Sequence, residues 1–235
     1  MSGLRLRDGA IFVADAHYPR CDGSLISILR HIQKSPNRYQ QLFLAGDIFD
    51  LLFGYSPYCY EKNREAVDLL HAVSTETETI YIEGNHDFAL ENLFDNILTV
   101  PRQKQPLLLD SEYGTVAVSH GDRFETGLLY DIYSAAIRSK LLIRGLAFLH
   151  RQAIDTIVGN LKKKDICRRF DGFEEKIQRI LSHYPEDIPM VIEGHFHRAE
   201  IIGRYVSLPS LACQKQLALF ENGKMRFVNI DEFIS

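Results

Sequence analysis

Cysteine is scarce in this sequence and never occurs in the close pairs that mark zinc or redox motifs. The chain has 235 residues and four scattered cysteines, which are Cys21, Cys59, Cys167 and Cys213. Domains that depend on a disulfide framework are usually shorter and secreted, with regularly spaced cysteines. We therefore expect reduced cysteines and a cytoplasmic location.

Long apolar runs are also missing. A membrane-spanning helix needs roughly 18 uninterrupted apolar residues, and no window of the sequence approaches that length. The start, MSGLRLRDGAIFV, has neither the apolar region nor the small-residue cleavage site of a secretory signal. No internal repeat, low-complexity segment or proline- and glycine-rich linker is present. These absences favour a globular protein of the cytoplasm, which touches a membrane, if at all, from that side.

Strong charge of either sign is lacking. The net charge is −4, and such a mild value argues neither for nor against nucleic acid as a partner. Hydrophobic residues make up 46% of the chain and charged residues 25%, as in ordinary globular proteins. A chain of this length can bury a substantial core.

Short apolar runs alternate with helical patterns in the first half of the chain. Strands are predicted near residues 10–17, 41–47, 79–85 and 114–122, and helices at 22–34 and 58–73. Asp22 is available as the N-cap of the first helix. Strands that alternate with helices predict an α/β core.

The pattern changes to helix alone between residues 124 and 184, which we call the helical insert. Strand character returns at 188–197, and Asn222-Gly223 predicts a hairpin between the last two strands. We therefore expect an α/β domain formed by residues 1–123 and 185–235, with residues 124–184 inserted as a helical cap.

Five predicted strands end in a small residue that is followed at once by ligand-type side chains. The five endings are Ala14-Asp15-Ala16-His17, Gly46-Asp47, Gly84-Asn85-His86-Asp87, Ser119-His120-Gly121-Asp122 and Gly194-His195-Phe196-His197. Ligands of open α/β sheets bind outside the carboxyl ends of the strands, so these clusters are expected to converge. The small residues permit tight turns and leave room for an ion.

The donor types in these clusters point to a metal site. Two carboxylates, one amide oxygen and four imidazoles suit Mn²⁺, Fe or Zn²⁺ better than Ca²⁺. Seven ligands are too many for one tetrahedral ion, but they fit two ions about 3.5–4 Å apart that share a carboxylate and activate water for phosphoryl transfer. A single such ending is more often structural, and five together make that interpretation improbable. The other histidines, His31, His71, His150 and His183, fall in helical patterns and are interpreted as structural.

The ordered motifs D-x-H, G-D-x-x-D, G-N-H-D, S-H-G-D and G-H-x-H resemble those of the calcineurin-like metallophosphoesterase superfamily. The resemblance implies a four-layer α/β/β/α sandwich and a site for two divalent ions, with Mn²⁺ favoured and Fe or Zn²⁺ as alternatives. One ion would be held by Asp15, His17, Asp47 and His197. The other would be held by Asp47, Asn85, His120 and His195, so that Asp47 bridges the two.

The same resemblance assigns roles around the ions. Asn85 would stabilise developing charge, and His86 would contact the phosphate and protonate the leaving group. Asp50, Asp87 and Asp122 would support the ligands from behind. As candidates for phosphate contact we add the following two basic residues: Arg20 and Arg123.

Within that superfamily the chain resembles the UDP-2,3-diacylglucosamine pyrophosphohydrolases of lipid A synthesis. The likeness rests on length, on the GDIFD motif and on helices placed between S-H-G-D and G-H-x-H. It implies cleavage of a pyrophosphate to a lipid monophosphate and UMP at the cytoplasmic face of the inner membrane.

The composition of the helical insert bears on the substrate. Residues 138–169 hold nine Lys and Arg against two Asp, which gives 9 − 2 = +7, and apolar residues recur there at helical spacing. Such a basic amphipathic block suits an anionic lipid or membrane surface, although core packing under a solvated face explains the apolar stripe equally well. The alternatives are a phosphodiesterase or phosphatase acting on nucleotides or other small phosphoesters, and a nuclease. For a nuclease, the lack of a positive net charge and the local, apolar character of the basic block argue against a long groove that follows the nucleic-acid backbone. A non-catalytic scaffold would not keep every ligand.

Overall fold

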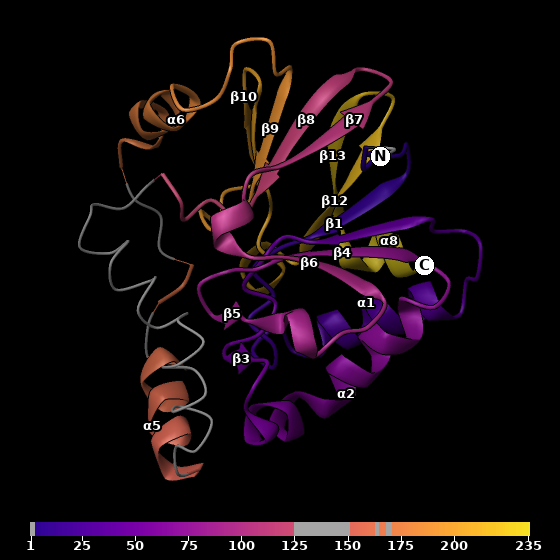
Figure 1. Ribbon diagram of the computed structural model, residues 1–235, viewed down its shortest axis with the longest axis vertical. Coiled ribbons are helices and arrows are strands. Elements are labelled where there is room, and N and C mark those ends of the chain that lie inside the picture. The colour runs from indigo at the N-terminus through magenta and orange to yellow at the C-terminus, as the bar shows by residue number, and fades with distance from the viewer. Residues whose placement is uncertain (1–2, 125–150, 163–164, 168–170) are drawn as a thin grey trace.

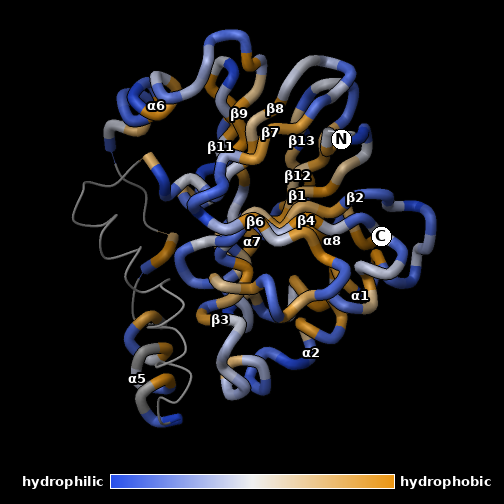
Figure 2. The backbone as a smooth tube through the Cα atoms, in the orientation of Figure 1, coloured by the Kyte–Doolittle hydropathy of each residue, from blue (hydrophilic) through white to orange (hydrophobic). Residues whose placement is uncertain are grey.

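Two β-sheets stacked face to face form the centre of the protein (Figure 1). The structure is a computed structural model, and it describes residues 3–124, 151–162, 165–167 and 171–235. Hydrophobic residues gather in the central strands, and hydrophilic residues lie along the peripheral loops (Figure 2).

The first sheet has six strands in the order β13-β12-β1-β2-β4-β6. Their bounds are β1 Ala10–Val13, β2 Gln41–Leu44, β4 Glu78–Ile82, β6 Ile97–Val100, β12 Gln216–Glu221 and β13 Lys224–Asn229. β1, β2, β4 and β6 are parallel, whereas β12 and β13 form an antiparallel hairpin at one side. The hairpin turns at Asn222 and Gly223, both with positive φ, as predicted.

The second sheet has five strands in the order β10-β11-β9-β8-β7. Their bounds are β7 Leu107–Ser111, β8 Gly114–Ser119, β9 Met190–Glu193, β10 Glu200–Ile202 and β11 Tyr205–Ser207. β8, β9 and β11 run parallel to one another. A small third sheet pairs β3 (Leu52–Phe53) with β5 (Asp87–Phe88).

Helices cover both outer faces of the sheets. α1 (Ser24–Gln33), α2 (Pro57–Val73) and α8 (Ile230–Ile234) pack on the first sheet, and α6 (Phe173–Leu181) packs on the second. Between the sheets, the rings of Phe12 and Phe43 stack with centroids 4.5 Å apart. The expected four-layer α/β/β/α sandwich is therefore confirmed.

The remaining described elements lie in connections. They are the short helices η1 (Leu90–Asn92), η2 (Arg102–Lys104) and α7 (Leu211–Gln214), and α5 (Arg151–Lys162). α5 and α6 are the described helices of the helical insert, and much of the rest of that insert lies outside the described residues. In the part of the chain that is described, no helix is both long and apolar enough to cross a membrane.

Two expectations from the sequence are wrong. Asp22 does not cap α1, because Gly23 takes the N-cap position with a φ of 77° and the Asp22 carboxylate pairs instead with Lys215. Cys167 and Cys213 are not reduced but form a disulfide with Cα atoms 5.5 Å apart. Their sequence separation of 46 gives no local signal, because only the tertiary fold brings the two cysteines together.

The stacked rings between the sheets generate a prediction for stability. Phe43→Ala should lower the free energy of unfolding by about 3–5 kcal/mol, because the buried ring leaves a cavity beside Phe12. Denaturant unfolding measures the change. Leu108→Ala, at a side chain on β7 that is 53% exposed, is the control and should change stability by less than about 0.5 kcal/mol. Equal losses in both variants would contradict the assigned core.

Candidate metal centre

The carboxyl ends of the parallel strands in both sheets meet at one edge. In the first sheet Val13 pairs with Leu44 and Leu44 with Tyr81, so β1, β2 and β4 end side by side. In the second sheet Ser119 pairs with Glu193, which aligns the ends of β8 and β9. The loops that follow these five strands carry the predicted ligand residues, which are Asp15, His17, Asp47, Asn85, His120, His195 and His197.

Five of these ligand residues adopt a left-handed backbone. Their φ values are 47° for Asp15, 47° for His17, 51° for Asp47, 65° for His195 and 52° for His197. Non-glycine residues rarely adopt such angles, and clusters of them occur at functional sites, where the surrounding structure holds the strain. Left-handed residues therefore follow β1, β2 and β9 where the predicted ligands lie.

Backbone hydrogen bonds hold these turns in place. The Asp15 amide donates to the Gly46 carbonyl at 3.1 Å, and the His17 amide donates to the Asp47 carbonyl at 2.9 Å. Across the sheets, the His195 amide donates to the Asp15 carboxylate at 3.0 Å. The two sheets are thus joined at the site itself.

Glycines give the side chains room to converge. A Cβ atom on Gly46 would lie 2.3 Å from His120 Nδ1, and one on Gly84 would lie 2.2 Å from Asp47 Oδ1. A Cβ atom on Gly194 would lie 3.0 Å from Asp15 Oδ2. The glycines at these strand ends therefore maintain the space around the ligands.

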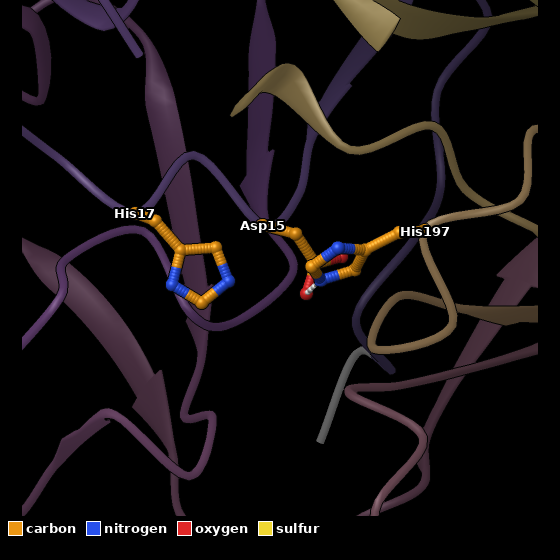
Figure 3. Close-up of side chains that lie close together, drawn as sticks. All are labelled: Asp15, His17 and His197. Atoms are coloured by element: carbon orange, nitrogen blue, oxygen red, sulfur yellow. Dashed lines mark ion pairs between the residues drawn. The ribbon is translucent and has the colours of Figure 1, made fainter. Parts of the chain in front are cut away.

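Asp15, His17 and His197 form the first triad of candidate ligands (Figure 3). Each offers one ligand atom, and these atoms lie within 4.8 Å of one another. His197 Nε2 is 3.0 Å from Asp15 Oδ1, and the centroids of the His17 and His197 rings are 5.4 Å apart. A single ion could contact all three side chains.

Asp47, His120 and His195 form the second triad, with their ligand atoms equally close. His120 Nε2 lies 3.6 Å from Asp47 Oδ2 and 3.2 Å from Asn85 Oδ1. The Ala45 carbonyl accepts a hydrogen bond from His120 Nδ1 at 3.0 Å, so Nδ1 carries the proton and Nε2 is left to bind a cation.

His86 lies between the triads, with an edge-on His17 ring 5.0 Å away. Its Nδ1 donates to the Asp50 carbonyl at 2.8 Å, which directs Nε2 to within 4.0 Å of Asp47 Oδ2. The His86 side chain is 14% exposed, whereas that of His120 is fully buried. His86, slightly more exposed than His197 at 11%, is therefore within reach of a substrate.

The surroundings of His17 fit a bound cation. The ring is buried, and among the described residues neither of its nitrogens has a hydrogen-bond partner. A buried imidazole without partners is costly, and a metal ion at the first triad would satisfy one nitrogen. The mixed carboxylate, amide and imidazole donors agree with this fit.

Mutual attraction shifts the pKa values of the ligand groups. Burial alone would raise the pKa of Asp47, but the His120 and His86 rings hold it well below its usual value. Burial would lower the pKa of His120, but Asp47 holds it well above the usual value. Burial lowers the pKa of His195, which is further lowered by His120. The carboxylate is thus ionised and available to a cation throughout the neutral range.

Asp87 supports the ligands from behind. Its buried carboxylate accepts hydrogen bonds from the backbone amides of Asp47 at 3.0 Å and Gly84 at 2.9 Å, and from the Tyr81 hydroxyl at 2.7 Å. The Ile48 amide adds a further bond at 2.6 Å. Asp87 therefore fixes the loop that presents Asp47.

Asp50 and Asp122 are also buried beside the ligands. Asp50 lies 3.7 Å from His17 Nδ1 and forms an ion pair with Arg20 at 2.9 Å. Asp122 forms an ion pair with Arg102 at 2.9 Å. Arg20 is thus engaged with a supporting carboxylate, while the Arg123 guanidinium lies 5.4 Å from the centroid of the Phe124 ring. Phosphate contact by either arginine stays a prediction.

Sequence reasoning missed two supporting residues. Gln105 Oε1 accepts a hydrogen bond from the His120 amide at 2.9 Å, and its Nε2 donates to the Glu83 carbonyl at 2.8 Å. Glu193 accepts hydrogen bonds from the hydroxyls of Ser119 at 2.7 Å and Tyr205 at 2.8 Å. Gln105 belongs to no motif, so the sequence gives no sign of its role. Glu193 is a carboxylate at the end of an apolar strand, and that position could have identified it.

Comparison with known proteins agrees with this geometry. The family model described as calcineurin-like phosphoesterase matches residues 10–199, which include every predicted ligand. The chain belongs to the calcineurin-like phosphoesterase family. It is accordingly a metal-dependent hydrolase of phosphoester bonds. In this family member, the two triads and Asn85 would hold the metal ions.

Individual relatives are distant. The chain is 21% identical over 201 residues to proteins named UDP-2,3-diacylglucosamine hydrolase from Salmonella newport and Salmonella typhimurium, covering 81% of this chain and 82% of each relative. A solved structure of a cold-active protein tyrosine phosphatase variant matches 99% of this chain and 81% of its own, with a TM-score of 0.50 and 14% identity. The structural likeness shows the fold alone.

The glycine contacts generate a prediction for metal binding. Gly84→Ala should lower the metal content of the purified protein at least tenfold, because its Cβ would displace the Asp47 carboxylate. Elemental analysis after dialysis against Mn²⁺ measures the content. Gly159→Ala in α5, where a Cβ has nothing within 4 Å among the described atoms, is the matched control and should load metal normally. Normal loading of Gly84→Ala would show that the Asp47 position is not critical.

Proposed function

We propose that the protein cleaves UDP-2,3-diacylglucosamine at its pyrophosphate, releasing UMP and a lipid monophosphate. The observation that supports the hydrolytic chemistry is the pair of adjoining ligand triads with His86 beside them. Mn²⁺ is the proposed metal. One ion would be held by Asp15, His17, Asp47 and His197, and the other by the second ligand set, which comprises Asp47, Asn85, His120 and His195.

The substrate is supported by two further observations. The curated relatives carry the name UDP-2,3-diacylglucosamine hydrolase and match over most of both chains. The segment 138–169 has the basic and apolar composition that a phosphorylated, acylated ligand requires. We therefore place the protein in the cytoplasm, in peripheral contact with the inner membrane, and expect no role for nucleic acid.

The described part of this segment is fastened to the core. In α5, Ile154 is buried, and Asp155 accepts a hydrogen bond from the Tyr58 hydroxyl at 2.8 Å and pairs with Lys62. Tyr58 and Lys62 belong to α2, whose preceding segment contains β3 beside the site. This attachment supports a substrate that extends from the metal centre towards α5.

Bound divalent ions would supply activated water and charge neutralisation at phosphorus. The residues of this chain would then orient the substrate and manage the leaving group. His86 Nδ1 is held as a donor by the Asp50 carbonyl, so a protonated His86 presents Nε2–H to the leaving oxygen. Asn85 donates from its amide to the developing negative charge. Arg20 and Arg123 are the proposed phosphate contacts.

Side-by-side hydrolysis tests the substrate assignment. With Mn²⁺ present, the protein should hydrolyse UDP-2,3-diacylglucosamine with a kcat/KM at least a hundredfold above that for bis-p-nitrophenyl phosphate. Single-stranded DNA should remain uncut. Hydrolysis of the generic diester alone would reject the lipid substrate in favour of a phosphodiesterase of small phosphoesters. Inactivity of the metal-loaded protein on all three would reject the catalytic proposal.

Substitution of His86 tests the assigned division of roles. His86→Ala should retain bound metal and lower kcat about 10²–10⁴-fold, because a proton donor is lost while the ligands remain. Asp47→Ala is the comparison and should lose both metal and activity, since Asp47 lies in the second triad and is the proposed ligand of both ions. Elemental analysis and steady-state kinetics on the same preparations separate the two effects. Loss of metal from His86→Ala would make His86 a ligand.

A further inference from the structure

The disulfide between Cys167 and Cys213 joins the helical insert to the core beside the metal centre. Cys167 follows α5 and is exposed, whereas Cys213 lies in α7 and is half-buried. The other two cysteines, Cys21 and Cys59, are buried free thiols. Reagents in solution can therefore reach the Cys167–Cys213 disulfide, whereas the two free thiols are shielded from them.

The short helix α7 contacts the first triad directly. Cys213 Sγ lies 3.5 Å from His197 Nδ1, on the opposite side of the ring from Asp15. Gln214 Nε2 donates to the His197 carbonyl at 2.7 Å, and Ser210 Oγ donates to the Asp15 carbonyl at 2.9 Å. Movement of α7 would therefore disturb two ligands of one ion.

The segment 165–167 approaches the same ring. Cys167 is bonded to Cys213, whose Sγ atom lies 3.5 Å from His197 Nδ1. The disulfide thus holds residues 165–167 close to a candidate metal ligand. Groups that orient a ligating imidazole typically change metal affinity 10–100-fold when they are removed.

We propose that Cys167 and Cys213 form a reversible thiol–disulfide site, whose disulfide form fastens residues 165–167 against His197 and strengthens metal binding at the first triad. The co-reactant is a low-molecular-weight disulfide of the glutathione class. The thiolate of one cysteine attacks it, forming a mixed disulfide and releasing one thiol. The second cysteine then attacks its partner's sulfur and releases the second thiol. Two protein thiols are oxidised, and the small disulfide is reduced to two thiols.

The exposure of Cys167 favours reversible oxidation at the Cys167–Cys213 pair, whereas Cys21 and Cys59 are buried. Exposed disulfides are open to exchange, and in reducing compartments such bonds usually sense redox state. Burial raises the pKa of the Cys21 thiol and of the Cys59 thiol, which makes both poor nucleophiles. Cys21 and Cys59 therefore provide internal controls within the same chain.

Alkylation followed by peptide mass spectrometry tests the bond. In native protein equilibrated with glutathione disulfide, iodoacetamide should label neither Cys167 nor Cys213, and the linked peptide should be found. After treatment with a phosphine reductant, both should be labelled while Cys21 and Cys59 stay protected. Labelling of Cys167 and Cys213 under the oxidising condition would overturn the proposal.

Calorimetric titration with Mn²⁺ tests the link to the metal centre. The phosphine reductant should weaken the affinity of the intact protein about tenfold or more. Cys167→Ser and Cys213→Ser should each show the weaker affinity without reductant and no further response to it. Cys21→Ser should behave like the unaltered chain. If reductant changes thermal stability but leaves the affinity unchanged, the bond is only structural and the proposal is wrong.

The redox proposal and the proposed function can fail separately. If the disulfide is absent, or if it does not change the Mn²⁺ affinity, the proposed hydrolysis of UDP-2,3-diacylglucosamine is unaffected. A metal-loaded oxidised protein that hydrolyses no phosphoester rejects the proposed function, but not the redox site.

Discussion

The carboxylate of Asp87 is the constraint on which the metal centre depends. It binds the backbone of Asp47 and Gly84 and the Tyr81 hydroxyl, and so ties the loop after β2 to the loop after β4. With that loop fixed, the Asp47 side chain reaches both the His120 ring and the amide of His86. The burial of these charges is tolerated because each carboxylate has several donors.

The second sheet completes the site, and hydrogen bonds to buried carboxylates hold its strand ends as well. Its strand ends are aligned through Ser119 and Glu193, whose side chains also bond to each other at 2.7 Å. The Asp15 carboxylate then accepts the His195 amide and so joins the sheets. Phe12 and Phe43, paired neighbours on β1 and β2, stack on each other within the core between the two sheets. The metal centre typical of the family thus forms because hydrogen bonds and the packed core hold the strand ends together.

Local sequence predicted the fold class and the convergence of the ligand residues, because apolar runs, glycines and polar endings are all local signals. It placed the strand before Asp15 well, although β1 stops at Val13, where the left-handed turn begins. It did not predict β6, whose residues alternate only weakly, or the cap at Gly23. The roles of Gln105 and of the disulfide were beyond its reach, since both depend on contacts between distant segments.

A crystal structure of the oxidised protein soaked with Mn²⁺, with anomalous scattering recorded, would show whether two ions bind at the strand ends. Two anomalous peaks that share Asp47 are expected, one beside Asp15, His17 and His197 and the other beside His120 and His195. A single peak, or two peaks that leave His17 without a metal contact, would contradict this expectation.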